Sequence, residues 1–221
     1  MNYKYISIII CCYNSSEFII ETLDSVKKQT YKNYEIIIID DGSSDNTVSI
    51  VNNYINQNPN LSINLFIQKN LGLPLSRNNA IAKSSYDLIA ILDHDDLWEP
   101  NKLSEQIKQI NENKNCVLFF SDFSYLNYKS DDKTRFETFK VKDNYLPYKL
   151  NLSKINGFIN LSLFGCFIGS STVIFKKEII NKIENFNSNY SFLTDYIFFL
   201  EISKNFDIHC SNLNLSKWRF H

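Results

Sequence analysis

The sequence predicts an α/β fold built on a doubly wound sheet. Short runs rich in β-branched residues alternate with helical patterns along the chain, and several of these runs are almost continuously apolar. Such runs are typical of strands that are covered on both faces of a parallel sheet. We expect strands at 5–12, 34–40, 63–67, 87–93 and 116–121.

Helical patterns fill the gaps between these strands. Asn14 with Glu17 resembles a capping box, which would start the first helix. Pro100 is suited to the first position of the fourth helix. Apolar spacing marks the four helices at Ile19 to Val26, Val48 to Ile55, Ala80 with Ile81, and Leu103 to Ile110.

The alternation resumes from residue 169. We expect a strand at 169–175, helices near 176–183 and 195–204, and a last strand at 206–210. His209 lies in that last strand, so we expect it in the core or at a sheet edge. The chain has neither an internal repeat nor a low-complexity linker, which favours a single domain over residues 1–221.

Residues 123–158 interrupt this order. They mix tyrosine, phenylalanine and lysine without a sustained period, and they carry seven Lys or Arg against four Asp or Glu. Three interpretations of this segment remain open. It could be a mobile lid on the acceptor side, a flap that faces a membrane, or a solvent-exposed excursion of the chain without a functional role.

Polar clusters follow three of the predicted strands. CCYN follows the first, DDGSSDNT the second and DHDD the fourth. Ligands of doubly wound sheets bind beyond the carboxyl ends of the strands. Residues of these types also make ordinary turns, but three such loops at one rim favour a ligand site.

The DHDD loop supplies a candidate metal site. Asp93 and Asp95 are two residues apart at a strand end, so their side chains leave on the same face, whereas Asp96 should leave on the other. Oxygen ligands without cysteine favour Mg²⁺ or Mn²⁺, which usually complete their shell with water and substrate phosphates.

Composition excludes several classes of protein. With a net charge of −1, the chain lacks the broad basic surface that nucleic-acid binding requires. No apolar stretch approaches the roughly 20 residues that span a bilayer, and the N-terminus has no signal peptide, so we expect a cytoplasmic protein. The five cysteines have no C-x-x-C spacing and are expected to be buried free thiols.

Six stretches, taken together and in order, resemble the motifs of glycosyltransferase family 2. They are SIIICCYN, DDGSSDNT, NLGLPLSRNNAI, DLIAILDHDD, GSSTVIFKKEII and LTDYIFFLEI. The resemblance implies an inverting enzyme with the GT-A fold, a Rossmann-like, doubly wound mixed sheet with helices on both faces. It also implies that residues 1–122 bind a nucleotide sugar and that residues 123–221 form the acceptor side.

The resemblance assigns the candidate site residues. It places Asp195 as the catalytic base, and Asp95, Asp93 and His221 near a Mn²⁺ or Mg²⁺ ion. The residues it implies for nucleotide-sugar binding are Cys11, Tyr13, Asn14, Asp41, Asn70, Arg77, Asp93 and His94.

The chain departs from the family pattern at four positions. Cys11 stands where proline is frequent, Ala80 where glycine is, and His94 where serine is. Thr194 stands where glutamate is frequent, which leaves Asp195 alone as the candidate base.

The expected function is metal-dependent, inverting transfer of a hexosyl or N-acetylhexosaminyl group in cell-surface polysaccharide synthesis, such as that of capsule or lipopolysaccharide. The expected partners are a nucleoside-diphosphate sugar, with UDP expected, and a saccharide or lipid-linked saccharide acceptor. Peripheral contact with the inner face of a membrane is expected by analogy.

A catalytically silent sugar-nucleotide or glycan-binding subunit is the alternative function. A nucleotidyltransferase and a phosphorylation-receiver domain fit less well, because the required phosphate loop and the receiver's aspartate and lysine are missing in register.

Overall fold

A nine-stranded mixed sheet lies at the centre of the computed structural model, in the order β3-β2-β1-β4-β8-β6-β9-β5, with β7 paired to β9. The structure describes residues 3–127, 134–138, 151–152, 154–190 and 192–220. The strands are β1 (Ile6–Cys12), β2 (Tyr34–Asp40), β3 (Ile63–Ile67), β4 (Leu88–Ile91), β5 (Leu97–Trp98), β6 (Leu118–Leu126), β7 (Asn151–Leu152), β8 (Ile174–Lys176) and β9 (Ile208–Arg219). The helices are α1 (Ile19–Lys27), α2 (Thr47–Gln57), α3 (Leu73–Lys83), α4 (Lys102–Glu112), α5 (Arg135–Thr138), α6 (Lys154–Phe164) and α7 (Thr194–Asn205), with 3₁₀ turns η2 (Ser170–Thr172) and η3 (Lys177–Asn181).

Strands β1 to β4 form the parallel half of the sheet. β1 pairs in parallel with β2 and β4, and β2 pairs in parallel with β3. Because successive side chains alternate between faces, Ile8 enters one buried core and Ile9 the other. This burial on both faces explains the continuous apolar runs of the sequence.

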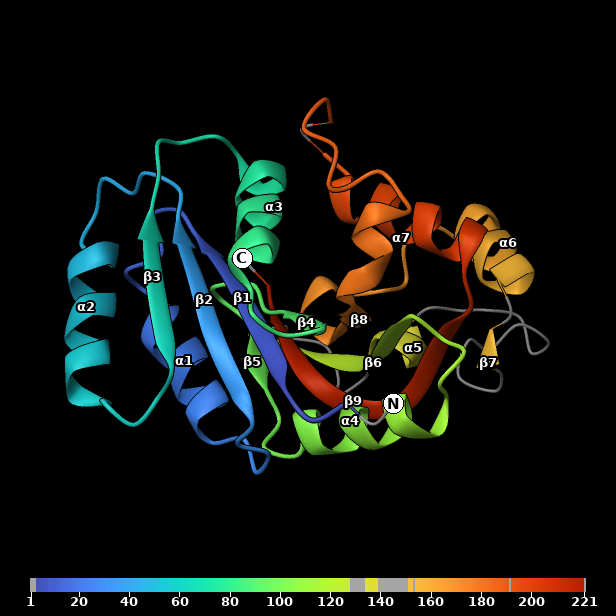
Figure 1. Ribbon diagram of the computed structural model, residues 1–221, viewed down its shortest axis with the longest axis horizontal. Coiled ribbons are helices and arrows are strands. Elements are labelled where there is room, and N and C mark those ends of the chain that lie inside the picture. The colour runs from blue at the N-terminus through green and yellow to red at the C-terminus, as the bar shows by residue number, and fades with distance from the viewer. Residues whose placement is uncertain (1–2, 128–133, 139–150, 153, 191, 221) are drawn as a thin grey trace.

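Helices cover both faces of this sheet (Figure 1). α1, α2 and α4 contribute buried apolar residues to the core that contains Ile8. α3, α6 and α7 contribute to the core that contains Ile9. The predicted α/β sheet with helices on both faces is confirmed.

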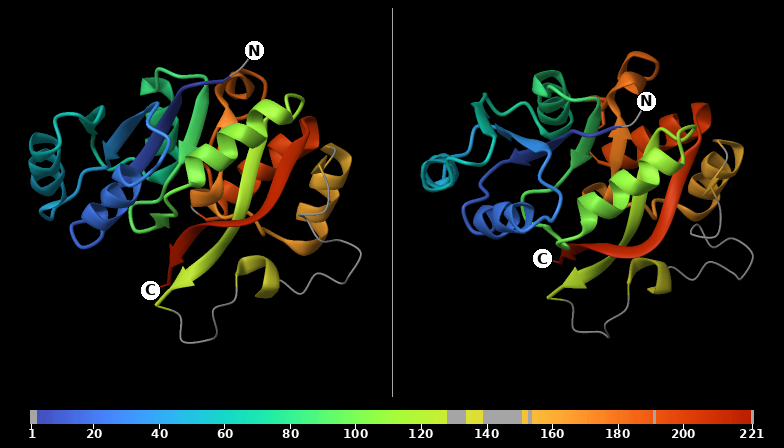
Figure 2. Two further views of the ribbon diagram at one scale, coloured as in Figure 1. Left: turned by 90° about the horizontal axis from the view of Figure 1, so that it is seen from below. Right: turned by 60° about the horizontal axis from the view of Figure 1, so that its bottom comes forward.

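The second half of the sheet breaks the parallel order. β8 runs antiparallel to both β4 and β6, whereas β6 and β9 run parallel to each other as long, curved strands (Figure 2). The strand predicted at 206–210 is too short, since β9 stays paired with β6 as far as Arg219 across a register shift near Asp122. Exposed residues in the middle of β9, Asn212 and Asn214, interrupt its apolar pattern.

The predicted capping box is wrong. Asn14 adopts a positive φ of 51°, and its side chain accepts hydrogen bonds from Ser44 and Asp45. α1 begins later, at Ile19, and has no side-chain cap. The intervening turn is closed by the Ser15 carbonyl, which accepts from the amides of Phe18 and Ile19.

Two other predicted helices also differ from the structure. α4 begins at Lys102, so Pro100 lies just before the helix, where its carbonyl accepts a hydrogen bond from the Thr30 amide. The helix expected near 176–183 is instead the short 3₁₀ turn η3.

The segment 123–158 is more regular than its sequence indicates. Its first residues extend β6 to Leu126, and it also contains α5, β7 and the start of α6. Residues 128–133, 139–150 and 153 lie outside the described part, so the choice among a lid, a flap and an excursion stays open.

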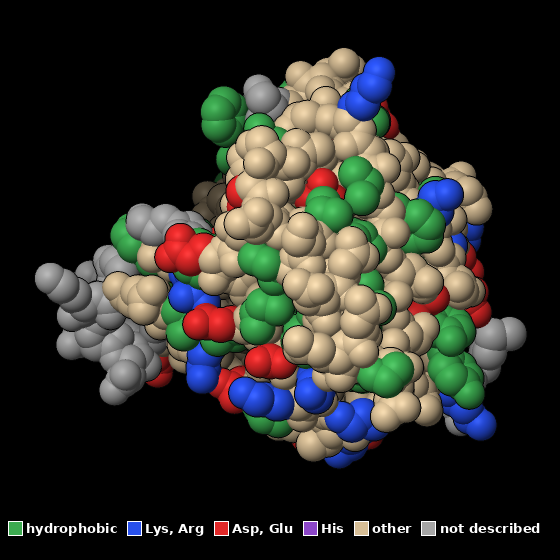
Figure 3. Space-filling view, turned by 90° about the vertical axis from the view of Figure 1, so that its left-hand side faces the viewer, with side chains coloured by type: hydrophobic (Ala, Val, Ile, Leu, Met, Phe, Trp, Pro, Cys, Tyr) green, Lys and Arg blue, Asp and Glu red, His purple; other side chains and the backbone are tan. Residues whose placement is uncertain are grey.

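The surface mixes both signs of charge on the face seen in Figure 3, where apolar side chains are scattered. In the described ranges, no helix combines the length and apolarity that crossing a bilayer requires. All five cysteines are free thiols; Cys12, Cys116 and Cys210 are buried as predicted, whereas Cys11 and Cys166 are only half-buried. His209 lies in β9 with its ring 5.6 Å from that of Phe119, which fits its predicted place in the core or at an edge.

Candidate functional site

A first cavity of about 530 Å³ opens beyond the carboxyl ends of β1, β2 and β4. The polar loops that follow these three strands thus meet at one cavity, as the sequence predicts. The predicted residues that line this cavity are Cys11, Tyr13, Asp41, Asn70, Arg77, Asp93, His94, Asp95 and Asp195. Asn14 does not line it, and His221 lies outside the described residues.

Asp41 fastens two loops of this cavity together. Its carboxylate accepts hydrogen bonds from the amides of Leu71 and Gly72, each at 2.8 Å, and from the Gln68 side chain at 2.7 Å. The next residue, Gly42, has a φ of +76°, and a Cβ there would lie 2.9 Å from the Asn70 amide nitrogen. Glycine is therefore required for this approach, which places Asn70 at the cavity.

Asn14 shapes the neighbouring loop instead. Its Oδ1 accepts from the Ser44 amide at 2.8 Å, and its own amide donates to the Ser43 hydroxyl at 2.9 Å. The residue is thus occupied in joining the loop after β1 to the loop after β2.

Cys11 is a half-buried thiol in the lining of the first cavity. Burial raises its pKa to about 12, and the nearby Arg77 opposes only part of that shift. Cys11 is therefore protonated at neutral pH and is not a nucleophile.

Arg77 lies at the centre of the site. Its side chain is only 2% exposed, and its two terminal nitrogens pair with Asp93, at 2.7 Å, and with Asp195. The Phe186 ring packs against the guanidinium, with its centroid 5.3 Å from Cζ. A buried guanidinium needs such partners, so Arg77 joins the loop after β4 to the start of α7.

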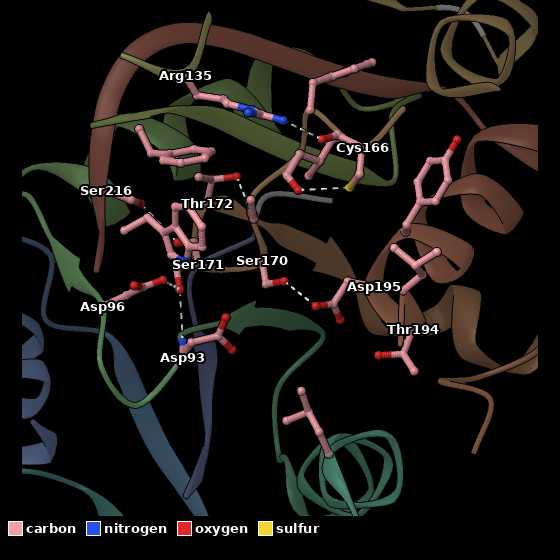
Figure 4. Close-up of a pocket in the computed structure, with 18 of the residues that line it drawn as sticks. Asp93, Asp96, Arg135, Cys166, Ser170, Ser171, Thr172, Thr194, Asp195 and Ser216 are labelled. Atoms are coloured by element: carbon pink, nitrogen blue, oxygen red, sulfur yellow. Dashed lines mark hydrogen bonds between the residues drawn. The ribbon is translucent and has the colours of Figure 1, made fainter. Parts of the chain in front are cut away.

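Asp195 is held at both carboxylate oxygens. Oδ1 accepts from Arg77, and Oδ2 accepts from the Ser170 hydroxyl at 2.7 Å (Figure 4). Asp195 lies in the first turn of α7, where the helix dipole favours a negative charge. Leu193, the residue just before α7, has a φ of +62°, a conformation that is uncommon for leucine.

Ser171 and Arg219 hold the DHDD loop in place. The Ser171 hydroxyl donates to Asp96 at 2.5 Å and accepts from the Asp93 amide at 3.0 Å. Arg219 donates its amide to the Asp96 carboxylate at 2.9 Å and its Nε to the Asp95 carbonyl at 2.8 Å. Burial, together with the charge of Asp93, raises the pKa of Asp96 to about 8. Asp96 is thus a buried loop residue, whereas Asp93 and Asp95 line the first cavity.

The donor set at this loop fits a hard divalent cation. Asp93 and Asp95 both reach the first cavity, although the described residues contain no group of three His, Cys, Asp or Glu side chains placed to hold a metal ion. The carboxylates Asp93 and Asp95 suit Mg²⁺ or Mn²⁺, because these ions usually keep several waters and bind substrate phosphates.

Four residues of the site were given no role by the sequence: Ser170, Ser171, Trp218 and Arg219. The GSST stretch was part of the family resemblance, but serine types alone do not indicate which carboxylates they will contact. Trp218 and Arg219 belong to the SKWRFH ending, which resembles the Arg-x-His motif of the family, but the motif gave a role only to His221. The predicted last strand ended at residue 210, so the contacts of Trp218 and Arg219 with the site were not expected.

A second cavity, of about 470 Å³, adjoins the first. Both cavities are lined by Leu73, Asp93, Asp195 and Trp218, so the two carboxylates joined by Arg77 lie where the cavities meet. The second cavity extends past Ser170 and Ser171 toward β6 and β9 (Figure 4).

The chain is similar to known proteins, of whose length it spans only part. The chain is 30% identical over 220 residues to the uncharacterized glycosyltransferase RT0329 of Rickettsia typhi, covering 98% of this chain and 64% of that protein. It is 31% identical over 216 residues to UDP-Glc:alpha-D-GlcNAc-diphosphoundecaprenol beta-1,3-glucosyltransferase WfgD of Escherichia coli, covering 97% and 76%.

The fold is also known among solved structures. The crystal structure of S. aureus TarS 1-349 in complex with UDP matches with a TM-score of 0.75 at 22% identity, over 98% of this chain and 60% of that one. The model of the family Glycosyl transferase family 2 matches residues 7–183. Because this match covers most of the sequence, the chain belongs to glycosyl transferase family 2.

Proposed function

We propose that the chain transfers a sugar, with inversion, from a nucleoside-diphosphate donor to a hydroxyl group of a saccharide acceptor. The observation that carries this proposal is the position of Asp195, held between Arg77 and Ser170 at the meeting point of two cavities. In the proposed arrangement the donor fills the first cavity and the acceptor enters the second.

Residues of the first cavity would bind the donor. Tyr13, which is half exposed there, would contact the base, with Asp41 and Asn70 beside it. Asp93 would contact the ribose side, and Arg77 would hold Asp93 in place while its charge offsets that of the diphosphate. UDP is the proposed nucleotide, since the name of WfgD includes UDP-Glc and TarS has been crystallised in complex with UDP.

Asp95 and Asp93 would hold a divalent cation, Mn²⁺ or Mg²⁺, with His221 as a further proposed ligand. When bound there, such an ion offsets the negative charge of the donor diphosphate. The carboxylates Asp93 and Asp95 fit this role because both line the first cavity. Arg219 supports it by fixing the Asp95 backbone.

Asp195 would act as the general base. Hydrogen bonds to both of its oxygens orient the carboxylate, which would accept the proton of an acceptor hydroxyl as that oxygen attacks the anomeric carbon. The bond to the diphosphate oxygen breaks on the opposite face, so a single displacement inverts the configuration.

The proposed biological setting is cell-surface polysaccharide synthesis in the cytoplasm or at the inner face of a membrane. Support comes from the name of WfgD, which includes a GlcNAc-diphosphoundecaprenol acceptor. The proposed acceptor is a saccharide or lipid-linked saccharide, and the proposed transferred group is a hexosyl or N-acetylhexosaminyl residue.

A screen of nucleotide sugars for hydrolysis, with and without Mn²⁺, tests this proposal. We expect a nucleotide sugar to be hydrolysed slowly in the presence of Mn²⁺ and not after chelation with EDTA. UDP should bind in calorimetry whether or not hydrolysis is fast. Binding of UDP without any hydrolysis or transfer would favour the catalytically silent subunit, and absence of both would overturn the proposal.

A further inference from the structure

An aromatic wall lines the second cavity on the side of β6 and β9. It consists of Phe123 and Tyr125 from β6 and Trp218 from β9. Tyr125 lies opposite Trp218 in the parallel ladder, and Phe123 is two residues earlier on β6, so the three side chains share one face of the sheet. Their ring centroids lie 5.5 to 6.2 Å apart in edge-to-face contacts.

The aromatic wall has a fixed position. Phe123 is buried against Gly169, where a Cβ would lie 2.9 Å from the Phe123 ring. The absence of a Cβ at Gly169 permits this close approach of the Phe123 ring, which Tyr125 and Trp218 contact edge to face. The outer part of the wall remains accessible, since Trp218 is 43% exposed although it is a large aromatic side chain.

The remaining lining of the second cavity shows what kind of ligand fits. Its carboxylates are Asp93, Asp96 and Asp195, while Arg135 donates to the Cys166 carbonyl at 3.0 Å. Asp96 is protonated near neutral pH because its pKa is raised to about 8, but Asp93 and Asp195 still outnumber the one guanidinium in this lining, so the cavity disfavours an anionic ligand. Figure 4 shows Ser216, which is on the same strand as Trp218, and Asp195 on opposite sides of Ser170. A ligand lying against the aromatic wall would thus face the proposed base.

We propose that the aromatic wall is a stacking platform for an uncharged pyranose ring, the terminal sugar of the acceptor. This inference rests on the proposed function, because Asp195 must be the base that the sugar hydroxyl meets. A pyranose ring has an apolar face of C–H groups that suits an aromatic surface and polar edges that suit Ser170 and Asp195. The cavity volume of about 470 Å³ lies within the range of small-molecule sites.

Tryptophan fluorescence provides a test that does not need turnover. The chain has two tryptophans, of which Trp98 is 4% exposed and Trp218 is 43% exposed, so quenching by acrylamide reports mainly on Trp218. With UDP and Mn²⁺ present to fill the first cavity, methyl β-D-glucopyranoside and methyl N-acetyl-β-D-glucosaminide should protect Trp218 from quenching. Sorbitol at the same concentration lacks the ring and should not. Equal protection by sorbitol, or no protection by either glycoside, would overturn the proposal.

Substitutions test the same surface by kinetics. Tyr125→Leu should raise the acceptor KM roughly tenfold relative to the donor KM, because a stacking ring is lost. Tyr125→Phe keeps the ring and should restore the acceptor KM to within about threefold of wild type. Tyr190→Leu removes an exposed tyrosine that lines neither cavity and is the matched control.

The outcomes separate the two proposals. If the wild-type protein hydrolyses a nucleotide sugar but Tyr125→Leu and Tyr190→Leu have the same acceptor KM, the stacking platform is wrong and the proposed function stands. If no nucleotide sugar is hydrolysed and UDP does not bind, the proposed function fails. Circular dichroism of each variant checks that the fold is intact, and the quenching titration of the wild type applies even if Tyr125→Leu does not fold.

Discussion

At the scale of single residues, the site depends on one guanidinium that joins two carboxylates. Arg77 satisfies Asp93 and Asp195 together, and Ser170 supplies the remaining hydrogen bond to Asp195. A carboxylate held in this way cannot rotate freely, so Asp195 has the orientation that the proposed general base needs before a substrate arrives. Such preorganisation is where a positioned carboxylate gains its effect on the rate.

Substitution of Asp195 tests its role directly. Asp195→Asn keeps the shape of the side chain but removes its basicity, so turnover should fall by about 10² to 10⁴ while UDP affinity changes little. Ser170→Ala removes only an orienting hydrogen bond and should lower turnover by roughly tenfold. Steady-state transfer and UDP calorimetry measure both effects, and equal turnover in Asp195→Asn and wild type would remove Asp195 from the base role.

The sequence carried much of this site because its charged residues follow strand ends. Asp41, Asp93 and Asp95 could be expected at one rim from the alternation of strands and helices alone, whereas Arg77, which lies in α3, and Asp195 were assigned only through the family resemblance. The contacts that hold them could not, since Ser170 and Arg219 reach the site through tertiary packing across the sheet. No local pattern indicates which carboxylate a serine will contact.

At the scale of elements, loops with unusual backbone angles decide how the strand ends meet. Gly42 allows the loop after β2 to approach the loop that carries Asn70, and Asp41 then fastens the two. The capping box at Asn14 failed for a related reason. A positive φ at Asn14 turns its side chain toward residues 44 and 45 rather than toward the start of α1.

Two glycine substitutions separate backbone strain from steric contact. Gly42 and Gly165 have similar φ values, +76° and +78°, but a Cβ at Gly165 has nothing within 4 Å. Gly165→Ala should therefore cost only the strain of about 1 kcal/mol. Gly42→Ala should cost at least about 1 kcal/mol more, because the Asn70 backbone must move. Urea unfolding measures both costs.

The same pair should differ in substrate binding. Only Gly42→Ala displaces the loop that lines the first cavity, so only this variant should raise the donor KM. An equal loss of stability in the two variants, with an unchanged donor KM, would show that the close approach at Gly42 is not important.

At the scale of the whole molecule, a parallel half and a mixed half are joined in one sheet. The first half could be predicted almost to the residue, because strands buried on both faces leave continuous apolar runs. The second half could not, since β9 is partly exposed and β8 reverses direction. In β9 the apolar pattern is interrupted by exposed residues, and in β6 the pairing with β9 shifts register at a bulge near Asp122.

His209 in β9 should make the stability of the molecule depend on pH. Burial lowers its pKa below the usual 6.5, and the Glu112 carboxylate only partly opposes this. Below about pH 6.5 the unfolded chain therefore binds more protons than the folded chain at this residue, so the free energy of unfolding should fall as the pH falls. His209→Gln should have a shallower slope there and the same slope above pH 7. Urea titrations from pH 5 to 8 measure this, and parallel curves would contradict it.

The bridge made by Arg77 also has a consequence for biosynthesis. Arg77 and Asp93 leave the ribosome well before Asp195 and Arg219, which are 118 residues beyond Arg77 and 124 residues beyond Asp95, respectively. In a nascent chain that has already formed the parallel strands, Arg77 would still be paired only with Asp93. The DHDD loop would also lack its hydrogen bonds from Arg219. The proposed catalytic centre would therefore be assembled only after β9 has been added to the sheet, so partly synthesised chains could not hydrolyse the cell's nucleotide sugars.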